Sequence, residues 1–243
     1  MFYYLLKPIL SFNFILIAAA VIPAVFLMIK VYRADRLEKE SPYFLRKLVT
    51  AGILSSLLAL VEEKVLSYVL DLVIDPSSYL YNIVLYFVVV ALSEESSKYI
   101  FLKRRTWRSD EFNCQFDGVV YAVFVSLGFA LWENISYVLS YGFSTALVRA
   151  VTAIPGHACF GVFMGVFYGA AKRSEGVGKH GASKIYRAFA LLLPVLLHGT
   201  YDYFATVSSE IGNYSFIGFV AVMFIVSYVL VGKTSKKDRY IRS

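Results

Sequence analysis

Seven apolar runs divide the chain, and each is long enough to cross a lipid bilayer as a helix. An α-helix rises 1.5 Å per residue, so about 20 residues span the hydrocarbon core of a membrane. The sequence therefore predicts an all-α polytopic membrane helix bundle of about seven transmembrane helices, forming a single unit over residues 1–243. The runs cover roughly residues 9–29, 48–70, 79–102, 117–141, 144–171, 185–205 and 214–232.

Composition and charge distribution support this class of protein. The chain is 58% hydrophobic and only 17% charged, which is typical of membrane proteins and not of soluble domains. Its net charge of +7 does not indicate a nucleic-acid partner, because the basic residues gather in alternate connections, within 30–47, 103–116, 172–187 and the tail 233–243. The positive-inside rule then predicts a multi-pass protein of the cell membrane with the N-terminus outside and a basic cytosolic tail.

The third run carries ionisable side chains where hydrocarbon should surround them. Glu94, Glu95 and Lys98 lie inside it, and each such group costs roughly 2.5–3.5 kcal/mol on insertion scales. Partners or a water-filled cavity are therefore required. Glu94 and Lys98 are one helical turn apart and can pair, so we expect Lys98 to be the counter-charge for one carboxylate, leaving the other to hold a proton or bind water. A structural ion pair that locks two helices explains these three residues equally well.

Three later runs supply further polar groups. Glu133 follows Phe129 by one turn, His157 follows Pro155-Gly156 in the next run, and His198 and Asp202 are one turn apart. A lone membrane Glu often hydrogen-bonds a neighbouring helix, and a lone His is more often a core residue than a ligand. Two imidazoles and an Asp opposite a carboxylate pair favour a shared site, since a carboxylate can orient an imidazole ring.

The second run contains one more acidic pair, Glu62 and Glu63, followed by Lys64. We expect it nearer the outer end of its helix, as an interfacial or bundle-locking cluster. A role at the site is the less favoured alternative.

Three glycines recur every four residues in the fifth run, at Gly161, Gly165 and Gly169. Small residues on one helix face let helix backbones approach closely in lipid. The pattern predicts a packing seam, either within the bundle or between chains.

At four positions in order, the chain resembles the PrsW-type intramembrane proteases, relatives of the CAAX prenyl endopeptidases and of bacterial CAAX-protease-like membrane proteins. Four motifs on four successive runs are more specific than any one alone. The CAAX endopeptidases have a His where this chain has Glu133, so prenyl-protein processing is not expected. The motifs are Glu94-Glu95-x-x-Lys98, Phe129-x-x-x-Glu133-Asn134, His157, and His198-x-x-x-Asp202.

The resemblance implies an intramembrane endopeptidase with a catalytic core at about 79–205. Its expected substrate is a single-span membrane protein, such as an anti-sigma factor cut in regulated proteolysis. By analogy, one of Glu94 and Glu95 activates water, and His198 with Asp202 stabilises the oxyanion. The implied catalytic residues are Glu94, Glu95, Glu133, His198 and Asp202, with Lys98, Phe129, Asn134 and His157 in support.

Two alternatives remain at this point. No cofactor is expected, but zinc is possible, held by His157, His198 and one of Glu94, Glu95 and Glu133, since imidazole and carboxylate are zinc ligands. The other alternative is a proton-coupled transporter or a non-catalytic scaffold. Inverted-repeat symmetry, which would favour transport, is not evident in the sequence.

Overall fold

The computed structural model describes residues 2–207 and 209–241, with side chains from Phe14 onward. Within these ranges the chain forms nine α-helices and one π-helix, which confirms the predicted all-α fold. The last two residues of the predicted tail, 242 and 243, lie outside the described residues. The elements are α1 (Phe2–Ala34), α2 (Pro42–Val73), α3 (Tyr79–Val84), the π-helix η1 (Leu85–Ala91), α4 (Leu92–Thr106), α5 (Asp117–Tyr141), α6 (Phe143–Val151), α7 (Ala153–Gly176), α8 (His180–Thr206) and α9 (Glu210–Lys236).

Six helical stretches are long and apolar enough to span a membrane, so the chain is a multi-pass membrane protein. The third predicted run is instead built from α3, η1 and α4, each too short to span alone. Val84 and Leu92, at the two junctions, keep right-handed helical backbone angles, so the three segments follow one another without a turn. The fifth predicted run is also divided, because α6 ends at Val151 and α7 begins at Ala153, with Thr152 between them at φ −118° and ψ −72°.

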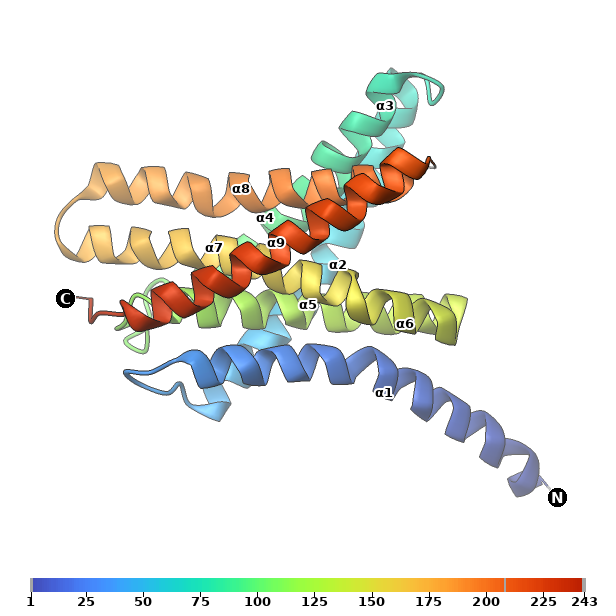
Figure 1. Cartoon of the computed structure of the whole chain (residues 1–243), viewed down its shortest axis with the longest axis horizontal. Helices are drawn as coiled ribbons and strands as arrows, with labels where there is room; N and C mark the ends of the chain where they lie inside the picture. Colours follow the sequence, from blue (N-terminus) through green and yellow to red (C-terminus); the bar gives the residue numbers. More distant parts are fainter. Residues whose placement is uncertain (1, 208, 242–243) are drawn as a thin grey trace.

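The connections alternate between the two ends of the bundle. Figure 1 shows the α1–α2, α4–α5 and α7–α8 connections together with the C-terminus at one end. The start of α1 lies at the opposite end, as an odd number of crossings requires. The connections that share an end are those in which the basic residues gather, which is the arrangement that the charge pattern predicts.

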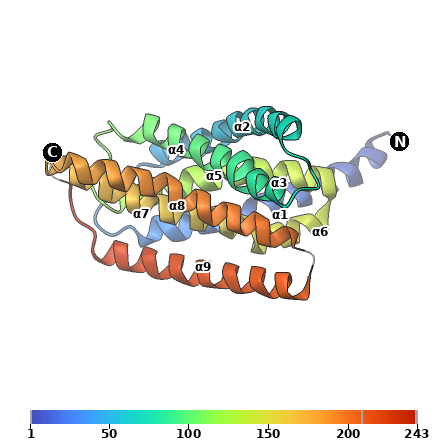
Figure 2. The same cartoon turned by 90° about the horizontal axis from the view of Figure 1, so that it is seen from above.

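Helix α5 forms the centre of the bundle. It is the most buried of the spanning helices, and it packs against α7, α2 and α1. Figure 2 shows α9 along one side of the bundle and α2 and α4 along the other. The side chains that line any internal site therefore come from helices grouped around α5.

Glycines make the α5–α7 contact possible. A Cβ added at Gly165 would lie 2.4 Å from Cα of Val119, and one at Gly169 would lie 2.1 Å from the carbonyl oxygen of Gln115. Real side chains do not tolerate such contacts, so a larger residue would push the helices apart. The predicted packing seam is confirmed, and it lies within the bundle.

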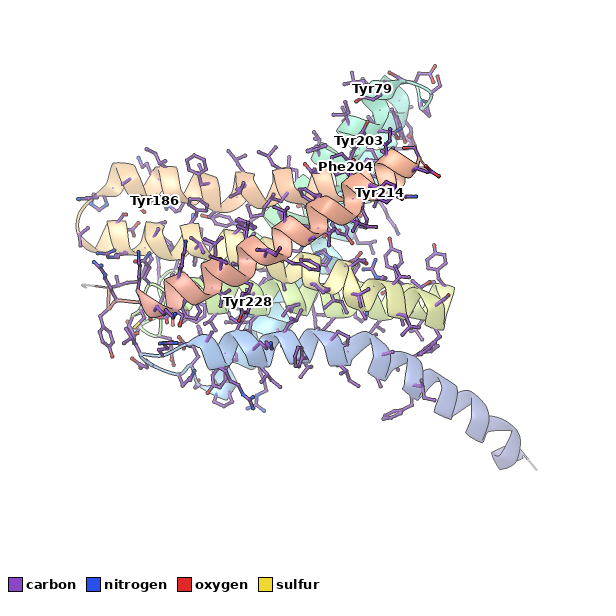
Figure 3. The ribbon with its side chains drawn as sticks, in the orientation of Figure 1. Tyr79, Tyr186, Tyr203, Phe204, Tyr214 and Tyr228 are labelled. Carbon is purple, nitrogen blue, oxygen red and sulfur yellow. The ribbon has the colours of Figure 1, made fainter. Side chains whose placement is uncertain are left out.

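Aromatic side chains mark the end of the bundle opposite the basic connections. Tyr79 at the start of α3, Tyr203 and Phe204 near the end of α8, and Tyr214 near the start of α9 all lie toward this end (Figure 3). The Tyr203 hydroxyl donates to the Tyr79 hydroxyl at 3.1 Å. Amphipathic rings of this kind favour the membrane–water interface, which places one bilayer surface at this level.

Candidate active site

A cavity of about 520 Å³ lies among α2, η1, α4, α5, α6, α7 and α8. Its lining residues on α5 and α8 fall in the C-terminal halves of these helices, so it lies toward the end opposite the basic connections. Two other predicted site residues, Glu95 and Lys98, are fully buried and do not line it, and Asn134 lies outside the lining as well. Six of the nine predicted residues line the cavity: Glu94, Phe129, Glu133, His157, His198 and Asp202.

Lys98 holds the two adjacent carboxylates together. Its Nζ lies 3.0 Å from Oε2 of Glu94 and 2.7 Å from Oε1 of Glu95. The expected pairing of Glu94 with Lys98 is confirmed, but the expectation that Lys98 pairs with only one of the two carboxylates is wrong. Positions three and four apart are both neighbours on a helix, so one ammonium reaches both carboxylates. Only Glu94 of this pair reaches the cavity.

The local backbone explains how the acidic pair meets α8. The π-helix η1 directly precedes the pair, and π-helical turns are frequent at functional sites. Gly199 of α8 lies against Phe87 of η1, where an added Cβ would be 2.5 Å from a ring carbon. The absence of a side chain at Gly199 therefore lets α8 approach the segment that carries Glu95.

His198 connects Glu95 to Asp202. Its Nδ1 lies 2.9 Å from Oε1 of Glu95, and its Nε2 lies 3.3 Å from Oδ2 of Asp202. Because both ring nitrogens face carboxylate oxygens, the doubly protonated imidazolium satisfies both contacts. Phe160 stacks on the ring at a centroid distance of 4.7 Å, which fixes its plane.

His157 connects Lys98 to Glu133. The Lys98 ammonium donates to Nδ1 of His157 at 3.1 Å, and Nε2 lies 2.8 Å from Oε2 of Glu133. An ammonium can only donate, so Nδ1 accepts and the ring proton sits on Nε2, facing Glu133. The Phe129 ring covers the ammonium, with Nζ 4.0 Å from the ring centroid. Phe129, the aromatic residue of the Phe129-x-x-x-Glu133-Asn134 motif, is therefore a cation–π partner of Lys98.

Arg149 is a site residue that sequence reasoning missed. Its guanidinium lies 3.0 Å from Oε2 of Glu133, donates to Oδ1 of Asn134 at 2.8 Å, and covers the ring of Tyr137. Asn134 also donates to the carbonyl oxygen of Ala20 in α1. Asn134 therefore positions Arg149 and joins two helices. An arginine inside the apolar run 144–171, on the side with few basic residues, was the available signal.

The acidic pair of α2 is closer to the site than expected. Glu63 lines the cavity. Glu62 accepts a hydrogen bond from Ser97 Oγ at 3.0 Å, which ties α2 to α4 beside the Lys98 network. The bundle-locking role predicted for this cluster fits Glu62, whereas Glu63 adds a carboxylate to the cavity wall.

The acidic pair and His157 form a set of possible metal ligands, with atoms of Glu94, Glu95 and His157 within 4.8 Å of one another. Carboxylate and imidazole suit zinc, and Oε2 of Glu95 has no hydrogen-bond partner within the described part of the chain. The donor types thus fit a divalent cation. Lys98 contacts all three residues, so its ammonium and a metal ion would compete for the same donors. His198, expected among the ligands, is not in this set.

A membrane-embedded helical bundle whose internal cavity is lined by carboxylates and imidazoles has the groups that hydrolysis inside a membrane requires. Comparison with known proteins makes this more specific. The model of a family described as PrsW family intramembrane metalloprotease matches residues 40–231. The chain belongs to this family and is an intramembrane protease.

Individual relatives agree with the family match. The chain is similar to Protease PrsW of Geobacillus kaustophilus (strain HTA426), with 35% identity over 201 residues, covering 83% of this chain and 84% of the relative. It is also similar to Protease PrsW of Clostridioides difficile (strain 630), with 29% identity over 217 residues, covering 87% and 84%. Protease PrsW of Bacillus subtilis (strain 168) is 38% identical over 117 residues, covering 48% and 52%. No solved structure matches the chain.

Proposed function

We propose that this protease hydrolyses a peptide bond of a single-span membrane protein, using water activated by Glu94. The observation that carries the proposal is that Glu94 alone of the acidic pair faces the cavity, while Lys98 and His198 hold it from behind. Glu95 is the positioning residue, because it is fully buried between Lys98 and His198.

Glu94 has the contacts that a general base needs. Its Oε2 lies 3.0 Å from Nζ of Lys98 and 3.9 Å from Nδ1 of His198. These contacts fix the side chain while the other oxygen remains available to water in the cavity. In the reaction, the water oxygen attacks the carbonyl carbon, its proton passes to Glu94, and the same proton goes to the leaving amine as the C–N bond breaks.

His198 and Asp202 supply the stabilisation of the oxyanion. The 3.3 Å contact between Nε2 of His198 and Asp202 is longer than the 2.9 Å contact of Nδ1 to Glu95. Nε2 is therefore the N–H that a substrate oxygen can accept in place of Asp202 while Nδ1 stays held. Positioned donors aimed at the developing negative charge are usually the largest single contribution to such catalysis.

The shape of the cavity favours a membrane-anchored substrate. Trp132, Tyr137 and Tyr201 line it beside the polar groups, and it lies toward the extracytoplasmic end that the charge pattern assigns. An apolar segment leaving the bilayer can lie along these rings and present its backbone to Glu94. An anti-sigma-factor-like protein with one span has this form.

Cleavage of a co-reconstituted single-span substrate tests the proposal. Glu94→Gln keeps size and hydrogen bonding but removes the base, so we expect a rate loss of about 10²–10⁴-fold, the range for general acid–base catalysis. Glu210→Gln, in the first turn of α9 and away from the cavity, is the matched control and retains full activity. Undiminished cleavage by Glu94→Gln and His198→Ala, with both variants folded, would exclude this site. Proton-dependent solute uptake without proteolysis would instead support a transporter.

A metal-dependent protease is the second candidate, favoured by the ligand set of Glu94, Glu95 and His157 and by the description of the family. A zinc ion held there would supply Lewis-acid activation of water. Metal content of the purified protein, compared between wild type and Glu94→Gln, distinguishes the candidates. Stoichiometric zinc lost in the variant, with activity restored by zinc after chelation, would replace the metal-free version.

A further inference from the structure

A second cavity, of about 220 Å³, lies at the basic end of the bundle. The start of α5, the later parts of α7 and α9, and the tail after α9 surround it. Its floor is apolar, formed by Phe116, Val119 and Val166. Four cationic side chains complete the lining together with two polar residues: Arg173, Lys233, Lys237 and Arg239, with Gln115 and Thr234.

The cations of this cavity are not neutralised by neighbouring acids. Within residues 2–207 and 209–241, no carboxylate forms an ion pair with any of the four. Arg173 donates to Oε1 of Gln115 at 3.2 Å, which is a neutral partner. The carboxylate of nearby Asp238 accepts from the backbone N–H groups of Phe116 and Arg239, both at 2.8 Å. The cavity therefore carries an excess of positive charge.

The tail holds this arrangement in place. The N–H of Gln115 donates to the carbonyl oxygen of Arg239 at 2.9 Å, and that of Ile241 donates to Asn113 at 2.6 Å. Ser235 also donates to the carbonyl oxygen of Ala34 at the end of α1. The first two contacts fix the tail against the segment before α5, and the third attaches the end of α9 to α1, so the cations are part of a built cavity.

We propose that this cavity binds the phosphate headgroup of an anionic phospholipid from the cytosolic leaflet. Basic pockets between transmembrane helices on the cytosolic side are suited to such headgroups. The apolar floor supports this source of phosphate over free phosphate, because Val166 is partly exposed on a spanning helix and can contact an acyl chain. The bound lipid would join α5, α7 and α9. The tail already connects the end of α9 to the segment before α5.

Thermal unfolding of the full chain with added lipid tests the proposal. The probes are phosphatidylglycerol, phosphatidylcholine and inorganic phosphate, each added to detergent-purified protein. Phosphatidylglycerol should raise the Tm of the wild type more than the other two do. The triple variant Lys233→Gln, Lys237→Gln, Arg239→Gln should lose this shift, with apparent affinity weaker by roughly tenfold or more.

A matched control removes the same number and kind of charges elsewhere. Arg33, Lys103 and Lys184 are exposed cytosolic-side cations that do not line the cavity, and their triple replacement by Gln should retain the shift. Val166→Trp fills the apolar floor without altering charge and should abolish the shift, which keeps the proposal testable if the first variant fails to fold. Equal responses of the two triple variants, or an equal shift with inorganic phosphate, would overturn it.

Discussion

The Lys98 ammonium lies 3.1 Å from Nδ1 of His157 and thereby turns the opposite ring nitrogen toward Glu133. The same ammonium binds Glu95, whose carboxylate holds His198. Two hydrogen-bonded chains therefore meet at one fully buried cation. The orientation of both imidazoles depends on a residue that does not itself reach the cavity.

Lys98→Met should destabilise the protein strongly. The substitution keeps much of the side-chain volume but leaves Glu94 and Glu95 buried without their shared cation. Removing one partner of a buried ion pair typically costs about 3–5 kcal/mol. A large fall in Tm in detergent, together with loss of substrate cleavage, is the expected result.

A double variant separates this electrostatic effect from lost packing. Glu95→Gln removes one of the stranded charges, so Lys98→Met with Glu95→Gln should be more stable than Lys98→Met alone. Lys98→Met combined with Glu210→Gln should gain nothing, since Glu210 begins α9, outside the network. Equal Tm values for the two double variants would mean that packing, not charge, explains the loss.

Gly199→Ala should lower activity by moving α8 away from η1. Its new Cβ would lie 2.5 Å from the Phe87 ring, so α8 or the ring must shift, and overpacking of this kind typically costs about 1–3 kcal/mol. The His198–Glu95 contact then lengthens, which should appear as reduced kcat in the cleavage assay.

Two further variants check the cause. Phe87→Ala combined with Gly199→Ala provides the missing space and should recover activity. Gly218→Ala, on α9, should leave cleavage unchanged, because among the described residues no atom beyond its own helix and chain neighbours lies within 4 Å of an added Cβ. If the double variant is no better than Gly199→Ala, the helix contact is not what the glycine preserves.

The positions of the helices and the convergence of the polar side chains could be predicted from the sequence. Both follow from which residues hydrocarbon and water favour. Apolar run length and the placement of basic residues fix which segments cross the bilayer. Carboxylates and imidazoles in hydrocarbon need one another, so Glu94, Glu133, His157 and His198 were expected to converge. Their convergence around one cavity is what the structure shows.

Other features depended on tertiary packing and left little trace in the sequence. The π-helical turn in η1 and the break at Thr152 both lie inside runs that read as continuous apolar helices. The Arg149 side chain reaches Glu133 and Asn134 because α6 folds back against α5. Glu63 reaches the cavity because of the path of α2, which hydropathy does not determine.

The stability of the cytosolic end should fall as pH rises between about 4.5 and 7. Glu40, in the α1–α2 connection, is only 6% exposed, and burial raises its pKa from 4.5 to about 7, against the opposing effect of a hydrogen bond from Tyr121. In that interval the folded chain keeps a proton on Glu40 that the unfolded chain has released. The stabilisation that comes from protonated Glu40 is therefore complete below pH 4.5, the pKa of the unfolded chain, and is lost above about pH 7, the pKa of the folded chain.

Glu40→Gln tests this dependence, because an amide resembles the protonated acid and does not titrate. Measured from pH 5 to 8, the Tm of this variant should fall less than that of the wild type. Asp110→Asn, an exposed change in the α4–α5 connection, should keep the wild-type slope. Identical slopes in all three proteins would assign the pH dependence to other groups.

Arg149 should act as a positioning residue for Glu133. It lies 3.0 Å from that carboxylate, and a lysine could keep the charge without the second contact to Asn134. Arg149→Gln should lower kcat roughly tenfold with little change in KM, since hydrogen bonds to charged groups contribute about 1.5–3 kcal/mol and partial exposure weakens this one. Arg149→Lys should recover part of the rate.

Lys64→Gln, which removes an exposed cation on α2 next to Glu63, is the control and should behave as wild type. If Arg149→Gln retains the full kcat, Glu133 is held well enough by His157 alone, and the arginine serves only to attach α6 to the bundle.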